Sequence, residues 1–249
     1  MLKRLSKRCW YMSGDHETDR PSLGYVQGDR QAMLVDCGNS PAHIGLMLEE
    51  IRKAGLPRPT MAVVTHAHWD HVYGMCALDI PVIASKETQA QLIRMEGWQW
   101  TEEAMLWRLA AREDIRFCHD CIVKEYQNPL DIRVRRADIV FSGKLTVDLG
   151  GCTADVIQLE NSHAADCAVI SVPDEGVLFT GDITYMDLHD DPPSWHMKRR
   201  GKLIEALHEL PFTVCVPGHQ DQMARDAFFA SLYEALAEDI ADGVVIKDD

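Results

Sequence analysis

Four potential metal ligands fall within six consecutive residues of this chain, in the run His66-Ala67-His68-Trp69-Asp70-His71. The run follows the apolar stretch 61–64, which has the pattern of a buried strand. Imidazole and carboxylate groups at this density suit divalent metals, with zinc the commonest in proteins and iron and manganese as alternatives. A polar surface loop with chance histidines is the simpler explanation, but it does not account for the density of ligands.

The spacing within the run favours two ions. In extended backbone, residues i and i+2 point to the same side, so His66 and His68 can bind one ion. Asp70 and His71 follow round a tighter turn and can reach a second ion close to the first.

Three residues far along the chain fit the same site, because each stands where a strand-like stretch ends: His163, Asp182 and His219. Ligands at strand ends are held by a rigid scaffold while they face an open cleft. Taken singly, an aspartate at a strand end is usually a turn or helix cap, and a lone histidine usually has no function. Together with the histidine run, the three residues indicate a shared metal site.

Strand-like and helical stretches alternate along the chain, which favours stacked sheets with helices outside. Residues 96–136 lack a strand pattern, so we expect a mostly helical insertion there, within a single domain of the α+β class over 1–249. The predicted strands are 31–35, 61–64, 81–84, 139–141, 145–149, 154–159, 167–172, 177–180 and 213–216. The predicted helices are 41–54 (with Ser40-Pro41 as its start), 86–95, 101–112, 197–210 and 221–239.

From about Gly24 to His219, the chain resembles the metallo-β-lactamase fold superfamily of hydrolases. The motifs that carry the resemblance are Val35-Asp36-Cys37-Gly38, His66-x-His68-x-Asp70-His71, and the single residues His163, Asp182 and His219. The resemblance implies a four-layer αββα sandwich. This set of motifs is specific for the superfamily and only weakly specific for a substrate.

The resemblance also implies a role for each residue. The first ion would be held by His66, His68 and His163. The second would be held by Asp70, His71 and His219, and both would be bridged by Asp182. Asp36 would orient a ligand histidine or its loop, although a turn-capping role explains Asp36 equally well. Two ions that share a water would lower its pKa enough to supply hydroxide near neutral pH.

Among the groups of the superfamily, the chain is similar to the glyoxalase II thioesterases and the acyl-homoserine lactonases. Tyr185 stands three residues after Asp182, where a lactonase tyrosine helps to hold the substrate carbonyl; a chance match explains it as well. The family's usual His-Thr-Pro-Gly-His/Ser is replaced here by His163-Ala-Ala-Asp166-Cys, and the sequence assigns Asp166 no role. We therefore expect a dinuclear hydrolase of a small ester, lactone or thioester, with Asp70 and Tyr185 as catalytic residues.

Other activities on the same scaffold remain alternatives. A mononuclear iron oxidoreductase similar to the persulfide dioxygenases would use the same motif, and a phosphodiesterase would use the same two ions. Antibiotic hydrolysis is disfavoured, because true β-lactamases of this fold lack the bridging aspartate and this chain has no recognisable secretory signal.

The formal net charge of −14 disfavours nucleic acid as a partner, since nucleic-acid binding depends on neutralising phosphates. The apolar runs are shorter than the roughly 18–20 residues that a membrane span requires. Eight scattered cysteines suit reduced thiols in a cytoplasmic protein. We expect a small-molecule substrate and no membrane partner, and a homodimer is compatible with the sequence.

Some residues keep two interpretations. Trp98, Trp100 and Trp107 could line an acyl pocket or pack a helix against the core. Cys118-His119-Asp120-Cys121 resembles a zinc knuckle or a redox pair, but no second Cys/His pair accompanies it, which favours chance proximity. His189 and His196 follow Asp182 closely and could approach the mouth of the site.

Overall fold

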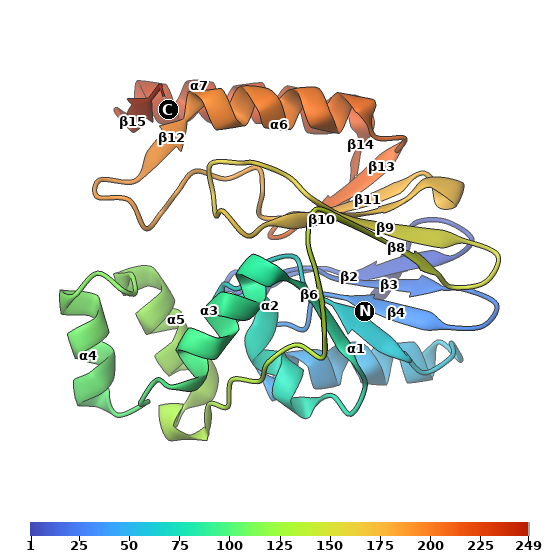
Figure 1. Ribbon diagram of the computed structural model, residues 1–249, viewed down its shortest axis with the longest axis horizontal. Helices are drawn as coiled ribbons and strands as arrows, with labels where there is room; N and C mark the ends of the chain where they lie inside the picture. The colour runs from blue at the N-terminus through green and yellow to red at the C-terminus, as the bar shows by residue number, and fades with distance from the viewer. Residues whose placement is uncertain (249) are drawn as a thin grey trace.

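Two β-sheets lie face to face between two layers of helices in the computed structural model, which describes residues 1–248 (Figure 1). This is the predicted αββα sandwich. The predicted domain span of 1–249 also includes Asp249, which lies outside the described residues.

The first sheet has seven strands whose order in space is their order along the chain. Its first four strands are antiparallel and its last four, from β4 onward, are parallel. The strands are β1 (Leu2–Arg4), β2 (Cys9–Met12), β3 (Leu23–Gln27), β4 (Ala32–Val35), β5 (Met61–Val63), β6 (Val82–Ser85) and β7 (Ile139–Phe141).

The second sheet has six strands in the order β14-β13-β11-β10-β9-β8, and β11 and β13 are its parallel pair. A small third sheet pairs β12 with β15. The strands are β8 (Lys144–Asp148), β9 (Thr153–Gln158), β10 (Ala168–Val172), β11 (Val177–Gly181), β12 (Ser194–His196), β13 (Val214–Pro217), β14 (Met223–Ala224) and β15 (Val245–Lys247).

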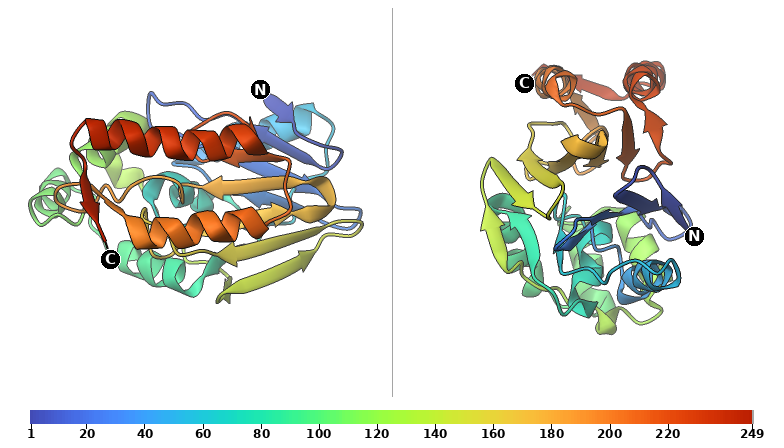
Figure 2. Two further views of the ribbon diagram at one scale, coloured as in Figure 1. Left: turned by 90° about the horizontal axis from the view of Figure 1, so that it is seen from above. Right: turned by 90° about the vertical axis from the view of Figure 1, so that its right-hand side faces the viewer.

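The helices cover the outer faces of the two sheets. Figure 2 shows α6 (Met197–Glu209) and α7 (Arg225–Ala241) side by side over the second sheet. On the opposite outer side lie α1 (Pro41–Lys53), α2 (Trp69–Val72), α3 (Lys86–Glu96), α4 (Glu102–Ala110) and α5 (Arg116–Tyr126). Short 3-10 turns occupy Tyr73–Ala77, Pro129–Asp131 and Pro173–Glu175. None of the helices in the described part of the chain combines the length and the apolar character that crossing a membrane requires.

Apolar side chains of both sheets meet in the middle of the sandwich. Val35, Val63 and Ile83 of the first sheet share one buried cluster with Ile170 and Phe179 of the second. Two further clusters lie outside this central one, one between the first sheet and its helices and one between the second sheet and its helices. This packing fixes the two sheets relative to each other, and therefore the loops at their common edge.

Most predicted elements are confirmed to within a few residues, and the exceptions have local causes. The histidine run is not loop throughout, since Trp69–Val72 forms one helical turn. The last helix starts at Arg225 and not at 221, because Met223 and Ala224 pair with β13 as a strand.

Candidate metal centre

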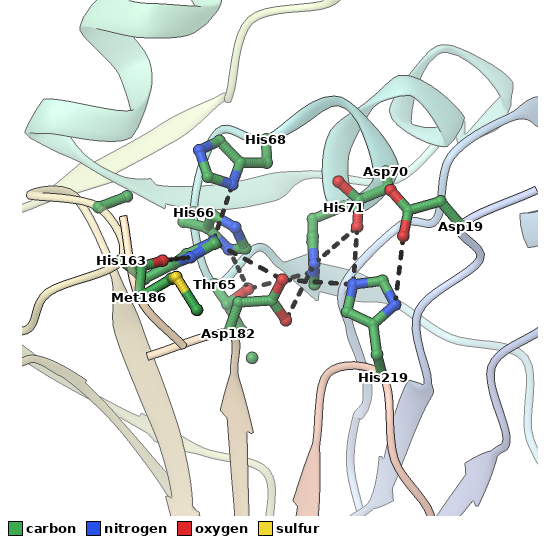
Figure 3. Close-up of polar contacts among 12 residues, drawn as sticks. Asp19, Thr65, His66, His68, Asp70, His71, His163, Asp182, Met186 and His219 are labelled. Carbon is green, nitrogen blue, oxygen red and sulfur yellow. Dashed lines mark hydrogen bonds and ion pairs between the residues drawn. The ribbon is translucent and has the colours of Figure 1, made fainter. Parts of the chain in front are cut away.

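The structure brings all seven predicted ligands together in two adjoining groups (Figure 3). Within each group, the potential ligand atoms lie within 4.8 Å of one another. The first group is His66, His68 and His163, and the second is Asp70, His71, Asp182 and His219.

The ends of parallel strands place six of these side chains, and His163 follows the antiparallel strand β9. The histidine run follows β5, Asp182 follows β11, and His219 lies just after β13. Because β4 and β5 are parallel, and β11 and β13 are also parallel, their carboxyl ends open at one edge of the sandwich. Each group therefore combines residues from both sheets.

Two glycines allow the backbone to approach the site closely. A Cβ atom at Gly218 would lie 1.8 Å from the Asp182 Oδ1 atom, and one at Gly181 would lie 2.6 Å from the Thr65 hydroxyl oxygen. Gly181 also has a positive φ of +51°, which L side chains rarely adopt. Any side chain at either position would displace the strand ends that carry the ligands.

Asp36 lies beneath the site with a positive φ of +62°, a conformation that aspartate tolerates better than most residues. Its Oδ1 accepts the Thr65 amide at 2.7 Å, and its Oδ2 accepts the Thr65 hydroxyl at 3.0 Å. The same Oδ2 lies 2.8 Å from His71 Nδ1. This contact leaves His71 Nε2 directed at the second group.

Hydrogen bonds on the far side of two other histidines leave their Nε2 atoms directed at the first group. His163 Nδ1 lies 3.1 Å from the Met186 carbonyl oxygen, so this nitrogen carries the proton. His66 Nδ1 lies 3.0 Å from the Thr65 hydroxyl. The opposite nitrogen of each ring then faces the first group, where His163 Nε2 lies 2.9 Å from His68 Nδ1.

The Asp182 carboxylate lies between the two groups. Its Oδ2 is 3.7 Å from His163 Nε2 in the first group and 3.3 Å from His219 Nε2 in the second. Its Oδ1 is 3.4 Å from His71 Nε2.

Burial and crowded carboxylates shift the pKa values of the site. Burial lowers the pKa of His66 and of His68 well below the usual range, which keeps both rings neutral. Burial would also lower the pKa of His71, but Asp70, Asp36 and Asp182 raise it above the usual range. For Asp182, burial raises the pKa, and the stronger combined effect of His219 and His71 lowers it. The carboxylates of the site thus stabilise positive charge beside them.

Four buried atoms of these groups form no hydrogen bond among the described residues, although ion-pair contacts of 3.0 to 3.4 Å join three of them: His66 Nε2, Asp70 Oδ2, His71 Nε2 and Asp182 Oδ1. Leaving a buried polar atom unpaired costs about 1–3 kcal/mol. Here all four belong to ligand types that divalent ions accept, and they converge on one place. The donor set therefore fits divalent metal ions.

Sequence reasoning missed Asp19, whose Oδ1 lies 3.6 Å from His219 Nδ1. Burial, with the nearby Asp70 charge, raises the pKa of Asp19 to about 7. Asp19 lies in the irregular loop between β2 and β3, where no sequence pattern marks it. Only the folded position of that loop identifies the residue.

Of the remaining candidate residues, the structure places two near the site and one away from it. Tyr185 lies beside both groups, with its ring centroid 6.1 Å from that of His163 and 6.2 Å from that of His219. His189 also approaches the site, at 5.1 Å between its ring and that of His68. His196 belongs instead to a separate cluster with Asp187 and Asp190.

The three tryptophans and the cysteine pair also differ in their surroundings. Trp100 is buried in the core, Trp107 is largely exposed, and Trp98 lines a cavity. Neither Cys118 nor Cys121 belongs to a cluster of potential metal ligands within residues 1–248, although Cys118 faces the site.

Two cavities open at the metal groups. The smaller, of about 320 Å³, is lined by Asp70, Asp182, Tyr185 and His219 among others. The larger, of about 580 Å³, extends from His68 and His163 under α3 and α5. Both have the size of a small-molecule site.

The chain is similar in sequence and in fold to known proteins. The family model described as "Metallo-beta-lactamase superfamily" matches residues 18–219. A solved structure described as a metallo-beta-lactamase from Pontibacter korlensis superposes with a TM-score of 0.62 at 19% identity, over 94% of this chain and 97% of that one. At that identity the superposition supports only the fold.

Two vertebrate proteins, both named acyl-coenzyme A thioesterase MBLAC2, are similar in sequence. The Gallus gallus protein is 25% identical over 189 residues, which cover 71% of this chain and 60% of that protein. The Homo sapiens protein is 23% identical over 234 residues, which cover 88% of this chain and 78% of that protein. The family match over residues 18–219 and the sandwich fold lead to one conclusion: this chain belongs to the metallo-beta-lactamase superfamily.

Proposed function

We propose that the protein is a dinuclear hydrolase that cleaves a small carbonyl ester, with a thioester as the first candidate and lactones and oxygen esters next. One observation carries the proposal: two groups of potential metal ligands adjoin at the mouths of two cavities. The names of the two vertebrate relatives favour a thioester among these substrates.

In this proposal the ligands divide between the ions as follows: His66, His68 and His163 hold one, Asp70, His71 and His219 hold the other, and Asp182 contributes to both. Zinc is the first candidate metal, since neutral imidazoles and carboxylates are its usual ligands. The position of Asp182 Oδ2 near ligand nitrogens of both groups supports the shared role.

When bound, the two ions would lower the pKa of water and polarise a carbonyl oxygen. The other contributions to the reaction come from residues of the chain. The Asp70 carboxylate stays ionised, since His71 and His219 keep its pKa low despite its burial, and we assign it a catalytic role as hydrogen-bond acceptor for the attacking water. The Tyr185 hydroxyl stays protonated, because burial and the Asp182 charge raise its pKa, and it donates a hydrogen bond to the substrate carbonyl.

The remaining parts of the proposal concern the whole protein. We place it in the cytoplasm, which suits its eight unpaired cysteines. We treat the chain as one domain in which 96–136, with α4 and α5, is a helical insertion beside the site. A homodimer remains compatible with this proposal.

Metal analysis and a substrate panel test the proposal. We expect about two zinc ions per chain, and chelator-sensitive hydrolysis within a panel of thioesters, lactones, phosphodiesters and β-lactams. Asp182→Asn should lose at least about a hundredfold in rate, because it removes a charge that both ions share. Asp155→Asn, a matched change on β9 at a carboxylate paired with Lys144, should keep full activity.

Two results would overturn the proposal. One iron per chain with oxygen uptake would establish the oxidoreductase alternative. Hydrolysis of phosphodiesters in preference to every carbonyl ester would establish the phosphodiesterase alternative.

A further inference from the structure

The larger cavity continues the space above the metal groups. Four residues line both cavities: His68, Cys118, His163 and His189. A substrate whose reacting carbonyl lies at the metal groups therefore has a second volume, of about 580 Å³, open to one of its two ends.

Apolar side chains form the deep wall of this larger cavity. Tyr73, Met95 and Ile122 line it and are almost fully buried. Trp98 adds a half-buried indole, and Ala90 of α3 adds a small side chain near the surface. This lining favours contact with hydrocarbon over contact with a polar group.

The charged residues at the outer part of the cavity disfavour an anionic ligand. Its two arginines are already paired: Arg94 lies 3.4 Å from Glu113, and Arg112 forms an ion pair with Asp191. The acidic residues that line this outer part outnumber these arginines, since they are Glu87, Glu113, Asp114 and Asp187. A carboxylate or phosphate on the substrate would meet net negative charge here.

We propose that this cavity binds the uncharged acyl chain of the substrate, while the leaving group exits through the smaller cavity past Tyr185. The proposal rests on the proposed hydrolase function and adds the substrate class: esters of medium or long apolar acyl groups. In this arrangement the helical segment with α5 and the residues around Trp98 set the chain length that the enzyme accepts.

A substitution that fills the cavity tests the proposal. Ala90 is exposed on α3 and lines the cavity, so Ala90→Trp adds bulk there without removing a core side chain. Ile93→Trp is the matched control, because Ile93 is an exposed residue of the same helix outside the lining of both cavities. Both variants and the unmodified zinc-loaded protein are assayed with acetyl, butyryl, octanoyl and palmitoyl thioesters of coenzyme A.

We expect kcat/KM of the unmodified protein to rise with chain length, by up to about fourfold for each methylene that the cavity accommodates. Ala90→Trp should lower kcat/KM for octanoyl or palmitoyl thioesters at least about tenfold and change the acetyl value less than about twofold. Ile93→Trp should follow the unmodified protein throughout. As a readout independent of turnover, we measure binding of S-octyl coenzyme A, a thioether without a carbonyl, by calorimetry.

The two readouts separate failure of this inference from failure of the proposed function. Thioester hydrolysis that is indifferent to chain length and to Ala90→Trp would overturn the acyl-pocket assignment and leave the activity intact. Thioether binding that Ala90→Trp abolishes, without hydrolysis of any ester, would support the pocket and overturn the proposed activity. Neither binding nor hydrolysis would overturn both.

Discussion

The Asp166 carboxylate accepts the Ala67 amide at 2.8 Å and the Thr88 hydroxyl at 2.9 Å. Ala67 lies between His66 and His68, so this contact fixes the backbone that orients both rings. Burial raises the pKa of Asp166, while the Thr88 and Ala67 contacts act in the opposite direction. Asp166 is therefore a positioning residue for the first metal group.

Replacing Asp166 tests that role. Asp166→Ala frees the Ala67 amide, and we expect the affinity for one of the two ions to fall about 10–100-fold. Asp166→Asn keeps an acceptor oxygen for the amide and should restore most of the affinity. Competition with a chromophoric chelator during metal loading measures the effect. Equal affinity in the alanine variant and the unmodified protein would contradict the assignment.

The sequence predicts the proposed ligands better than it predicts the residues that hold them in position. The seven proposed ligands are recognisable because four of them stand together and the others end strand-like stretches. Asp19, Asp166 and the Met186 carbonyl act through contacts between loops far apart in the chain. No local pattern encodes such contacts, so the folded structure was needed to find them.

Among the elements, α5 is joined to the rest of the molecule through Glu125. Its side chain is 2% exposed and accepts hydrogen bonds from Arg20, from the Thr18 hydroxyl and from the Ser40 hydroxyl. Ser40 also caps α1, by accepting the His43 amide at 3.0 Å. One carboxylate thus connects α5, the start of α1 and the loop that carries Asp19.

We expect Glu125→Ala to lower the free energy of unfolding by about 3–5 kcal/mol, because it leaves the Arg20 charge without its partner. Glu125→Gln should cost less, since it keeps an acceptor oxygen. Urea unfolding followed by tryptophan fluorescence measures both. Glu205→Ala on the exposed side of α6 is the control and should stay within about 0.5 kcal/mol of the unmodified protein.

The same contacts predict a pH dependence. Burial would raise the pKa of Glu125, but hydrogen bonds from Arg20, Ser40 and Thr18 lower it overall. A pKa lowered by folding contributes stability that is complete above the unfolded value, about 4.3, and is lost as the pH falls through the folded value. Unfolding measured from pH 6 to pH 3 should therefore show a smaller acid loss in Glu125→Gln than in the unmodified protein. An unchanged acid loss would contradict this account.

Local signals also explain which elements were predictable. The Ser40-Pro41 start of α1 is a property of adjacent residues, and the helix begins there. By contrast, β1 consists of Leu2, Lys3 and Arg4, and its strand conformation comes from pairing with β2. The α5 helix lacks a capping side chain at Ile115, so no signal marks its beginning.

For the whole molecule, the two metal groups lie on the seam between the sheets. His66, His68, Asp70 and His71 extend from the first sheet, and His163, Asp182 and His219 from the second. The seam is also bridged without metal, since the Ala168 amide donates to the Thr65 carbonyl at 2.8 Å. Metal binding should therefore stabilise the association of the sheets.

Removing the metal tests this coupling. At a free zinc concentration about a thousand times Kd, binding adds about 4 kcal/mol, which for a chain of this length corresponds to a rise in Tm of roughly 10 °C. We expect this rise on titrating zinc into chelator-treated protein and little rise in Asp182→Ala. Scanning calorimetry at fixed free zinc measures it, and an unchanged Tm in the unmodified protein would contradict ion binding between the sheets.

Neither sheet carries a complete set of donors for either ion. A shift of one layer against the other, by even an ångström or two, would disturb both coordination shells at once. Substitutions of core residues far from any ligand, such as Val63 or Phe179, would therefore weaken zinc retention. Under the proposed dinuclear site, metal retention would measure how accurately the two sheets are held together.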